Sequence, residues 1–213
     1  MKKIILLPIF LLYISSVSFG TCFSAFNDIT TSFNISPTFS ITPNPLSGEI
    51  ELPVGIPLLK NVDLWVNLST IAFSDSVISW EGIWVMPRYN IGSLGILPYN
   101  IIAIELAYPL NVSLQYHTEL SIVSEVFSIE ANIIGNLYQT LSLSTIIAPV
   151  LYLTKLVNLP LAIYLELDTN FGDFSSIENS IIAGVLIELS ENLELNLCYN
   201  FIGSINGWLS INF

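Results

Sequence analysis

The chain has 213 residues, of which 17 are acidic, five are basic and one is histidine, giving a formal net charge of −12. This excess of acid excludes a nucleic-acid-binding protein, which needs a basic surface. Hydrophobic residues make up 53% of the chain and charged residues only 10%, a composition too apolar for an ordinary secreted globular domain. Beyond the N-terminus, however, no stretch reaches the roughly 18 consecutive apolar residues of a transmembrane helix.

The N-terminus has the three regions of a secretory signal peptide. Lys2 and Lys3 precede a short apolar run, and Ser18 and Gly20 occupy the −3 and −1 positions of a cleavage site before Thr21. The apolar run is shorter than the roughly 20 residues that span a bilayer, which disfavours an anchoring helix. The pattern therefore predicts export and cleavage.

We predict a signal peptide at residues 1–20 and a single mature domain at residues 21–213. Cleavage leaves all 17 acidic residues but only three basic ones, so the mature net charge is −14. An exported protein reaches an oxidising compartment. Cys22 and Cys198 are therefore a candidate disulfide, with two free thiols an equal alternative because nothing in the sequence sets their distance.

Apolar and polar residues alternate with a period of two almost throughout the mature chain, as in β-strands and not in helices. Clusters of Gly, Pro, Asn, Asp and Ser separate the alternating runs and mark turns. In chain order, the predicted strands are 31–41, 49–58, 61–73, 77–89, 99–108, 110–117, 119–134, 139–156, 159–169, 180–190, 193–202 and 206–213. These twelve strands share about 16 residues each, enough for a 9–11-residue membrane span and a turn.

An even strand number places both termini at the same end, as in bacterial single-chain barrels. Ten strands is the main alternative, because Pro53 and Pro57 weaken the second predicted strand. The longest predicted loops lie near residues 90–98 and 170–180. No linker or charge run divides the chain.

The two faces of the alternation indicate a membrane environment. One face is Leu and Ile almost without interruption, and the other is Ser, Asn, Thr and acid, with almost no Lys or Arg. Aromatic residues collect near the predicted strand ends, as in the girdles of membrane barrels. These are Trp80, Trp84, Tyr89, Tyr99, Tyr108, Tyr116, Tyr138, Tyr199, Phe201 and Phe213. We predict an all-β fold, a closed antiparallel up-and-down transmembrane β-barrel in contact with lipid.

The last strand ends on an aromatic residue, with Leu209, Ile211 and Phe213 on one face. This ending resembles the C-terminal signature of bacterial outer-membrane β-barrel proteins, although Gly207 departs from the apolar pattern. The resemblance implies a small porin-like barrel in the outer membrane, with these three residues as the signal for the barrel-assembly machinery. The chain lacks the length and the constriction loop of general trimeric porins, which disfavours that group.

If Leu and Ile face lipid, the alternating acidic residues face the interior. We predict that the pore is lined by Asp63, Glu105, Glu130, Glu166, Asp168, Glu188 and Glu194. Glu81 has an ambiguous facing, and the basic residues Lys60 and Lys155 fall at turns. Hydrated carboxylates attract cations, so we predict a small passive channel with a weak cation preference that admits small cationic or neutral solutes. As alternatives, the acids hydrate an occluded interior of a non-conducting structural or surface-interaction barrel, or they bind divalent ions at the rim.

The sequence offers little for catalysis. His117 is the single histidine and falls at a predicted turn, and neither Ser113 nor Ser121 stands in a nucleophile motif. We therefore expect no enzymatic activity and no catalytic residue, metal site or cofactor. An outer-membrane lipid-modifying enzyme that uses His117 is the weaker alternative.

Overall fold

The computed structural model describes residues 29–74, 77–97, 99–108, 110–136, 142–172 and 176–213. Within these ranges the chain forms thirteen strand segments in one sheet and a short helix. In chain order they are β1 (Asn34–Ile35), β2 (Thr38–Pro43), β3 (Leu46–Leu59), β4 (Val62–Ser74), β5 (Val77–Asn90), β6 (Tyr99–Tyr108), β7 (Asn111–Val123), β8 (Phe127–Asn136), β9 (Ser142–Tyr152), α2 (Leu153–Val157), β10 (Leu161–Gly172), β11 (Ser176–Ser190), β12 (Leu193–Asn200) and β13 (Ser204–Asn212). No helix among these residues is long and apolar enough to cross a membrane.

The sheet closes on itself. From β2 to β13, each strand pairs antiparallel with the next strand in sequence, and β13 pairs with both β1 and β2. β1 and β2 are successive parts of one barrel strand, because both also pair with β3. They are interrupted at Pro37, which has no N–H to donate, while Ser36 N–H donates to Pro53 O at 2.9 Å and Leu209 N–H to Pro37 O at 3.0 Å. The prediction of a closed twelve-stranded barrel is confirmed.

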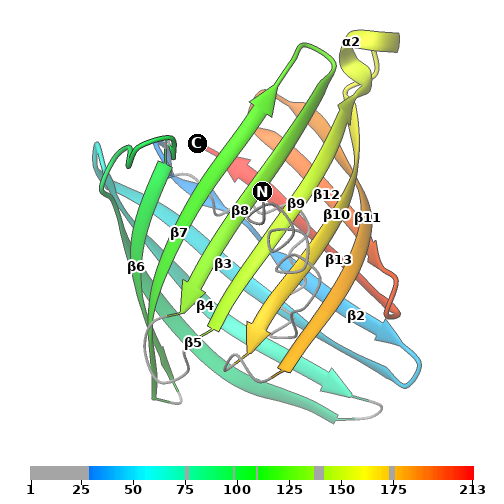
Figure 1. The fold of residues 1–213 in the computed structure, drawn as a ribbon. Helices are drawn as coiled ribbons and strands as arrows, with labels where there is room; N and C mark the ends of the chain where they lie inside the picture. The colour runs from blue at the N-terminus through cyan, green and yellow to red at the C-terminus, as the bar shows by residue number, and fades with distance from the viewer. Residues whose placement is uncertain (1–28, 75–76, 98, 109, 137–141, 173–175) are drawn as a thin grey trace, which may run out of the picture.

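The two ends of the barrel differ. Figure 1 shows strongly inclined strands, with α2 and the C-terminus at the same rim. We call this rim the terminal end and the opposite rim the distal end. The two longest connections that the structure describes in part or in full, residues 91–98 between β5 and β6 and residues 153–160 between β9 and β10, both lie at the terminal end. Two distal connections lie wholly within the described residues, at 44–45 and 201–203, and both are short.

The prolines of β3 do not remove a strand, so the ten-strand alternative is wrong. The register between β3 and β4 shifts between Glu51 and Pro53 and again between Pro57 and Leu59. Such bulges accommodate residues that cannot donate a ladder hydrogen bond. Leu52 N–H, displaced by the first bulge, donates to Asn67 Oδ1 at 3.0 Å. β3 therefore extends over 14 residues.

Two predicted boundaries are corrected. The polar residues around Thr118 are not a turn, because β7 runs on to Val123 and the Thr118 hydroxyl donates to Tyr99 O at 2.9 Å. The turn instead follows at Ser124, whose hydroxyl donates to Phe127 O at 2.8 Å and accepts from Phe127 N–H at 3.1 Å. Likewise, most of the loop predicted at residues 170–180 belongs to β10 and β11. His117 and Asn170, which lie in these segments, are on the inner face of their strands, where polarity does not signal a turn.

The outer surface is apolar, as expected for a barrel in lipid. Ile104 is 44% exposed and Leu165 49% exposed, although both lie in the middle of long strands. Leu161, Leu195 and Ile211 are not buried either. An exposed belt of this size is incompatible with a water-soluble monomer. The predicted transmembrane barrel is therefore confirmed by its closed sheet and its apolar exterior.

Aromatic side chains lie at both ends of the outer surface. Trp80 and Tyr108 pack at 5.9 Å between ring centroids near the distal end, and Phe33 and Phe213 at 5.8 Å at the terminal end. Trp84 was wrongly assigned to this girdle: its Nε1–H donates to the interior carboxylate of Glu51 at 3.2 Å. The predicted girdle residue Tyr138 lies outside the described residues.

Glycines face aromatic rings across neighbouring strands. Gly55 pairs with Trp65 and Gly184 with Tyr164 on the inner side, while Gly207 pairs with Phe39 on the outer side. A Cβ at Gly184 would lie 2.3 Å from the Tyr164 ring, and one at Gly207 would lie 2.8 Å from the Phe39 ring. The rings therefore lie flat against the sheet over the missing side chains. This packing also explains why Gly207 interrupts the apolar pattern of β13.

Candidate functional site in the barrel interior

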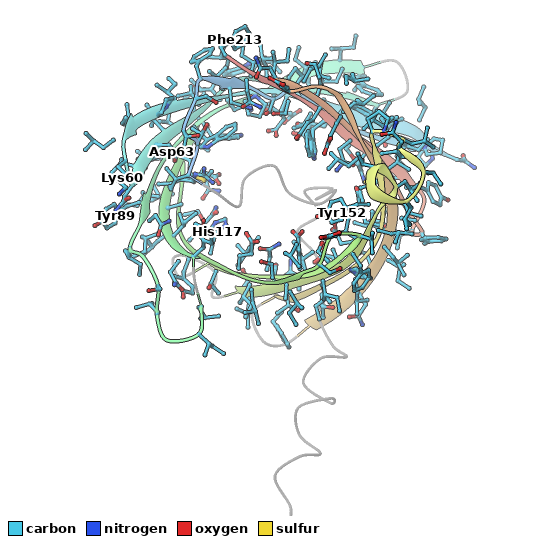
Figure 2. All side chains as sticks on the ribbon, turned by 90° about the horizontal axis from the view of Figure 1, so that it is seen from above. Lys60, Asp63, Tyr89, His117, Tyr152 and Phe213 are labelled. Atoms are coloured by element: carbon cyan, nitrogen blue, oxygen red, sulfur yellow. The ribbon has the colours of Figure 1, made fainter. Side chains whose placement is uncertain are left out.

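All seven acidic residues predicted to line the pore lie on the inner face. Residues that are register partners share a face of the sheet, and the other face carries the exposed Leu and Ile belt. The pairs are Asp63 with Arg88, Glu105 with Ser113, Glu130 with Ala148, Glu166 with Ile182, Asp168 with Ser180, and Glu188 with Glu194. Figure 2 shows Asp63 and His117 projecting into the ring, whereas Lys60 and Tyr89 lie toward its outside. Glu81 stands at the register shift of β5 and accepts a hydrogen bond from the Ser79 hydroxyl at 2.5 Å.

Asp63 is the centre of a buried ion pair near the terminal end. Arg88 donates from Nε to Asp63 Oδ1 at 2.9 Å and from Nη2 to Oδ2 at 2.5 Å, and both side chains are at most 1% exposed. Asp63 Oδ2 also accepts from Thr30 N–H at 2.8 Å and from Trp65 Nε1–H at 3.2 Å. The Arg88 guanidinium lies 5.5 Å from the centroid of the Trp65 ring. Asp63 is thus a structural acid whose charge is neutralised, and sequence reasoning missed its partner.

Glu51, on the inner face of β3, is a second centre that sequence reasoning missed. Its Oε1 accepts from Asn67 Nδ2–H at 3.1 Å, from Thr70 Oγ1–H at 3.0 Å and from Trp84 Nε1–H at 3.2 Å. These three donors are neutral groups, so none of them supplies a counter-charge to the carboxyl group. The alternation of Glu49 and Glu51 with Ile50 and Leu52 was the available signal, but the neighbouring prolines obscured it. We call the inner face of β3–β7 that carries Glu49, Glu51, Asp63 and Glu105 the carboxylate wall.

His117 lies on the inner face of β7 and not at a turn. Gln115 connects it to Glu105: Gln115 Nε2–H donates to Glu105 Oε2 at 2.9 Å, and Gln115 Oε1 lies 2.9 Å from His117 Nε2. Ser113 also contacts Gln115, at 3.1 Å, and not the imidazole. The pairing of His117 with an amide provides neither the nucleophile nor the carboxylate of a hydrolytic triad. Among the described residues, no group of three or more His, Cys, Asp or Glu is placed to hold a metal ion.

The interior carries far more acid than base. Lys60 lies in the β3–β4 turn, as predicted, whereas Lys155 lies in the short helix α2 and not in a turn; both are beyond the strands. Within the described strands, Arg88 is the one basic residue of the inner face, and Asp63 neutralises it. Glu188 and Glu194 are direct register partners on β11 and β12, so like charges stand opposite each other. The inner surface therefore has a negative potential.

Another part of the interior is built from amides, aromatics and small apolar residues. Asn34, Asn196, Asn206 and Asn212 lie on the inner faces of β1, β12 and β13, and we call this surface the amide wall. Trp208 lies among them, and the Tyr164 hydroxyl donates to Asn196 Oδ1 at 2.7 Å. Beside it, β9–β11 contribute a buried apolar cluster that includes Ala148, Val150, Ala162 and Ile182. The lumen is therefore chemically asymmetric.

Cys198 lies on the inner face of β12 and is disulfide-bonded. The sequence left open whether the two cysteines form a disulfide or are free thiols. In the structure, Cys198 is in a disulfide. Cys22, the other cysteine of the sequence, lies outside the described residues, as does the predicted signal peptide.

Comparisons with known proteins agree with this geometry. No protein-family model matches the chain, and no curated protein matches it. Among solved structures, one described as "KdgM porin" has a TM-score of 0.57 at 11% sequence identity and covers 84% of this chain and 99% of that one. A second, "KdgM porin in complex with disordered oligogalacturonate", has the same TM-score and coverage at 12% identity.

The fold is that of a porin-like outer-membrane β-barrel. At this level of identity the likeness concerns the fold, and the interior chemistry has to be read from this chain alone. The predicted outer-membrane location and the resemblance to small porin-like barrels are confirmed.

Proposed function

We propose that the barrel is a small passive channel with a weak preference for cations. The observation that carries the proposal is the charge of the inner face. Acidic residues on seven of the described strands (β3, β4, β6, β8, β10, β11 and β12) share this face with one basic residue, Arg88, which is already paired. Hydrated carboxylates along a lumen raise the local concentration of cations and lower that of anions. The shared fold of a porin supports conduction, and the charge supports the direction of selectivity.

The charge also separates this chain from its structural neighbour. Oligogalacturonate, named with the KdgM porin, is a chain of uronic acids and therefore a polyanion. A negative lumen without an unpaired arginine disfavours such a ligand. We infer that this barrel passes small cationic or neutral solutes instead.

Planar-bilayer recording of the refolded protein tests both parts of the proposal. We expect stepwise currents and, in a salt gradient, a reversal potential of the sign given by a cation-selective pore. The triple variant E105Q/E130Q/E166Q should move the reversal potential toward zero, because it removes three interior charges. The matched control E125Q/E191Q, which neutralises two carboxylates in turns at the terminal end, should shift it far less.

Each alternative has its own outcome. An absence of steps over repeated insertions, with folded protein in the membrane, would favour a non-conducting structural barrel. An unchanged reversal potential in the triple variant would remove the pore-lining role of these residues. The lipid-modifying enzyme predicts lipid hydrolysis that His117→Ala abolishes, and we expect none in either protein.

We further propose that residues 1–20 are cleaved on export and that Leu209, Ile211 and Phe213 guide insertion by the barrel-assembly machinery. Phe213 is 70% exposed, and Leu209 and Ile211 lie on the lipid-facing side of β13, so the motif is accessible from outside. Edman sequencing of the membrane fraction should begin at Thr21. Deleting Phe213 should lower the amount of folded barrel in the outer membrane, whereas the internal variant Phe201→Ala should not.

A further inference from the structure

A cavity of 240 Å³ lies inside the barrel at the terminal end, between the amide wall and β4. Its lining includes Asn34, Trp65, Glu194, Trp208, Ser210 and Asn212, together with the backbone segment at residues 29–32. The volume is below the roughly 300–1,000 Å³ of drug-sized sites, which limits the ligand to about one small ring. Aromatic faces with a few placed polar groups are the usual composition of a small-molecule site.

The cavity is assembled by register across four strands. Trp65 pairs with Gly55, Gly55 pairs with Asn34, and Asn34 pairs with Asn212. Because Gly55 has no side chain, the indole of Trp65 lies over β3, with the nearest ring atom 2.8 Å from where a Cβ would be. The tryptophan therefore leaves room above the amides of the neighbouring strands.

A hydrogen-bond network fixes the amides in place. Asn34 Nδ2–H donates to Ser210 Oγ at 2.7 Å and to Asn212 Oδ1 at 2.8 Å. Within the described residues this network leaves the Asn212 amide N–H groups and the Ser210 hydroxyl proton to donate to a ligand, and the Glu194 carboxylate to accept from one. Such preorganised donors and acceptors reduce the entropy lost on binding.

The same wall continues past the cavity with unused hydrogen-bonding atoms. Asn196 Nδ2 and Asn206 Oδ1 are buried and have no hydrogen-bond partner in the described part of the chain. Asn196 is the register partner of Trp208, and Asn206 lies two residues before it on β13. An unpaired donor and an unpaired acceptor beside an aromatic ring are complementary to a hydroxyl group, which both donates and accepts.

We propose that this cavity binds one uncharged sugar ring. Trp208 supplies an apolar face for the C–H side of the ring, and the amides and Ser210 bind its hydroxyls. The lining holds one carboxylate and no basic side chain, so an acidic sugar is disfavoured. A quaternary ammonium ion would also suit an aromatic ring, but it would leave the hydroxyls and amides unused, and Arg88 already lies against Trp65. The proposal goes beyond the channel function, because binding needs access from only one end.

Isothermal titration calorimetry of the refolded full chain in detergent tests the site, with glucose, galacturonate and choline as probes. We expect saturable glucose binding, with galacturonate and choline binding at least about tenfold more weakly. Trp208→Ala should weaken glucose binding about tenfold, whereas Trp208→Tyr should keep part of it. The matched control Trp80→Ala removes an outward-facing indole and should leave binding unchanged.

Two substitutions that remove or change fewer atoms keep the proposal testable if Trp208→Ala does not fold. Ser210→Ala should weaken glucose binding about threefold. Glu194→Gln should raise galacturonate binding relative to glucose, because it removes the repulsion between carboxylates. Tight choline binding, equal effects of Trp208→Ala and Trp80→Ala, or no glucose binding at 100-fold excess over the protein would each overturn the proposal. Calorimetry does not require a current. The binding result can therefore be interpreted even if the barrel does not conduct.

Discussion

The carboxylate wall and the amide wall are neighbours around one lumen, because β1 and β2 both pair with β3. Their polar side chains are nevertheless held in different ways. On β3–β7, charged groups are held by specific donors, as Glu51 is by Asn67, Thr70 and Trp84. On β12, β13 and β1, neutral amides bond to hydroxyls and to each other, and Asn196 and Asn206 keep unused atoms. The first arrangement sets an electrostatic potential, and the second offers hydrogen bonds to an uncharged solute.

The comparison shows that charged groups and neutral amides contribute to the polarity of the interior in different ways. A carboxylate acts over several ångströms and influences every ion in the lumen, whereas an amide acts only on a group in direct contact. Under our two proposals, selectivity for charge and recognition of a solute therefore depend on different kinds of side chain, which are concentrated on different strands. Substitutions on one wall should leave the property of the other wall largely intact.

The largest effect that we predict comes from separating the buried pair of the carboxylate wall. Asp63→Asn removes the carboxylate charge that Asp63 places against the buried Arg88 guanidinium, which should lower the free energy of unfolding by about 3–5 kcal/mol. The double variant D63N/R88M should recover most of this loss, because Asn keeps an oxygen for Thr30 and Trp65 while Met removes the charge. Urea unfolding followed by tryptophan fluorescence measures both.

The exposed turn variant Glu125→Gln is the matched control and should change the free energy of unfolding by less than about 0.5 kcal/mol. A loss below about 1 kcal/mol in Asp63→Asn would mean that water or another group compensates Arg88. The Asp63–Arg88 ion pair would then not be a stabilising feature that separates the carboxylate wall from the amide wall.

Much of the fold and part of the site follow from local sequence. The period of two determines which residues of each strand share a face, so Glu105, Glu166 and Glu194 were placed correctly on the inner side without knowledge of any contact. The strand count followed from turn residues. Where polar residues stood on the inner face of a long strand, as at His117 and Asn170, the same signals misplaced the boundaries, because an interior polar residue and a turn residue look alike.

What the sequence could not provide depends on register. Arg88 meets Asp63 across 25 residues only because β4 and β5 pair with a particular alignment, which includes register shifts at Asn67 and Thr70. The packing of Tyr164 over Gly184 and of Trp65 over Gly55 has the same origin. The amide wall and its cavity are therefore features of the closed barrel and not of any single strand.

A smaller effect is expected where the amide wall meets the apolar cluster. Gly184→Ala would place a Cβ 2.3 Å from the Tyr164 ring, so the ring must leave the wall and give up its hydrogen bond to Asn196. We expect a loss of about 1–3 kcal/mol in unfolding free energy and a lower single-channel conductance, because the ring moves into the lumen. The double variant G184A/Y164A should restore the conductance.

Gly207→Ala is the control for this effect, since Phe39 covers it on the outer face. It should destabilise the barrel without narrowing the lumen. An equal fall in conductance in Gly207→Ala would show that general destabilisation, and not the displaced ring, limits the current.

The smallest effect is expected at Glu188, which brings an acid to the edge of the amide wall. Glu188 and Glu194 are direct register partners, and like charges in this position destabilise a sheet. Glu188→Gln should therefore raise the free energy of unfolding, by about 0.2–1 kcal/mol, and the gain should shrink at high salt because screening already weakens the repulsion. Glu191→Gln, in the adjoining turn, should give a smaller gain. A destabilised Glu188→Gln barrel would mean that the two carboxylates share a bound cation, so that the amide wall also takes part in attracting positive charge.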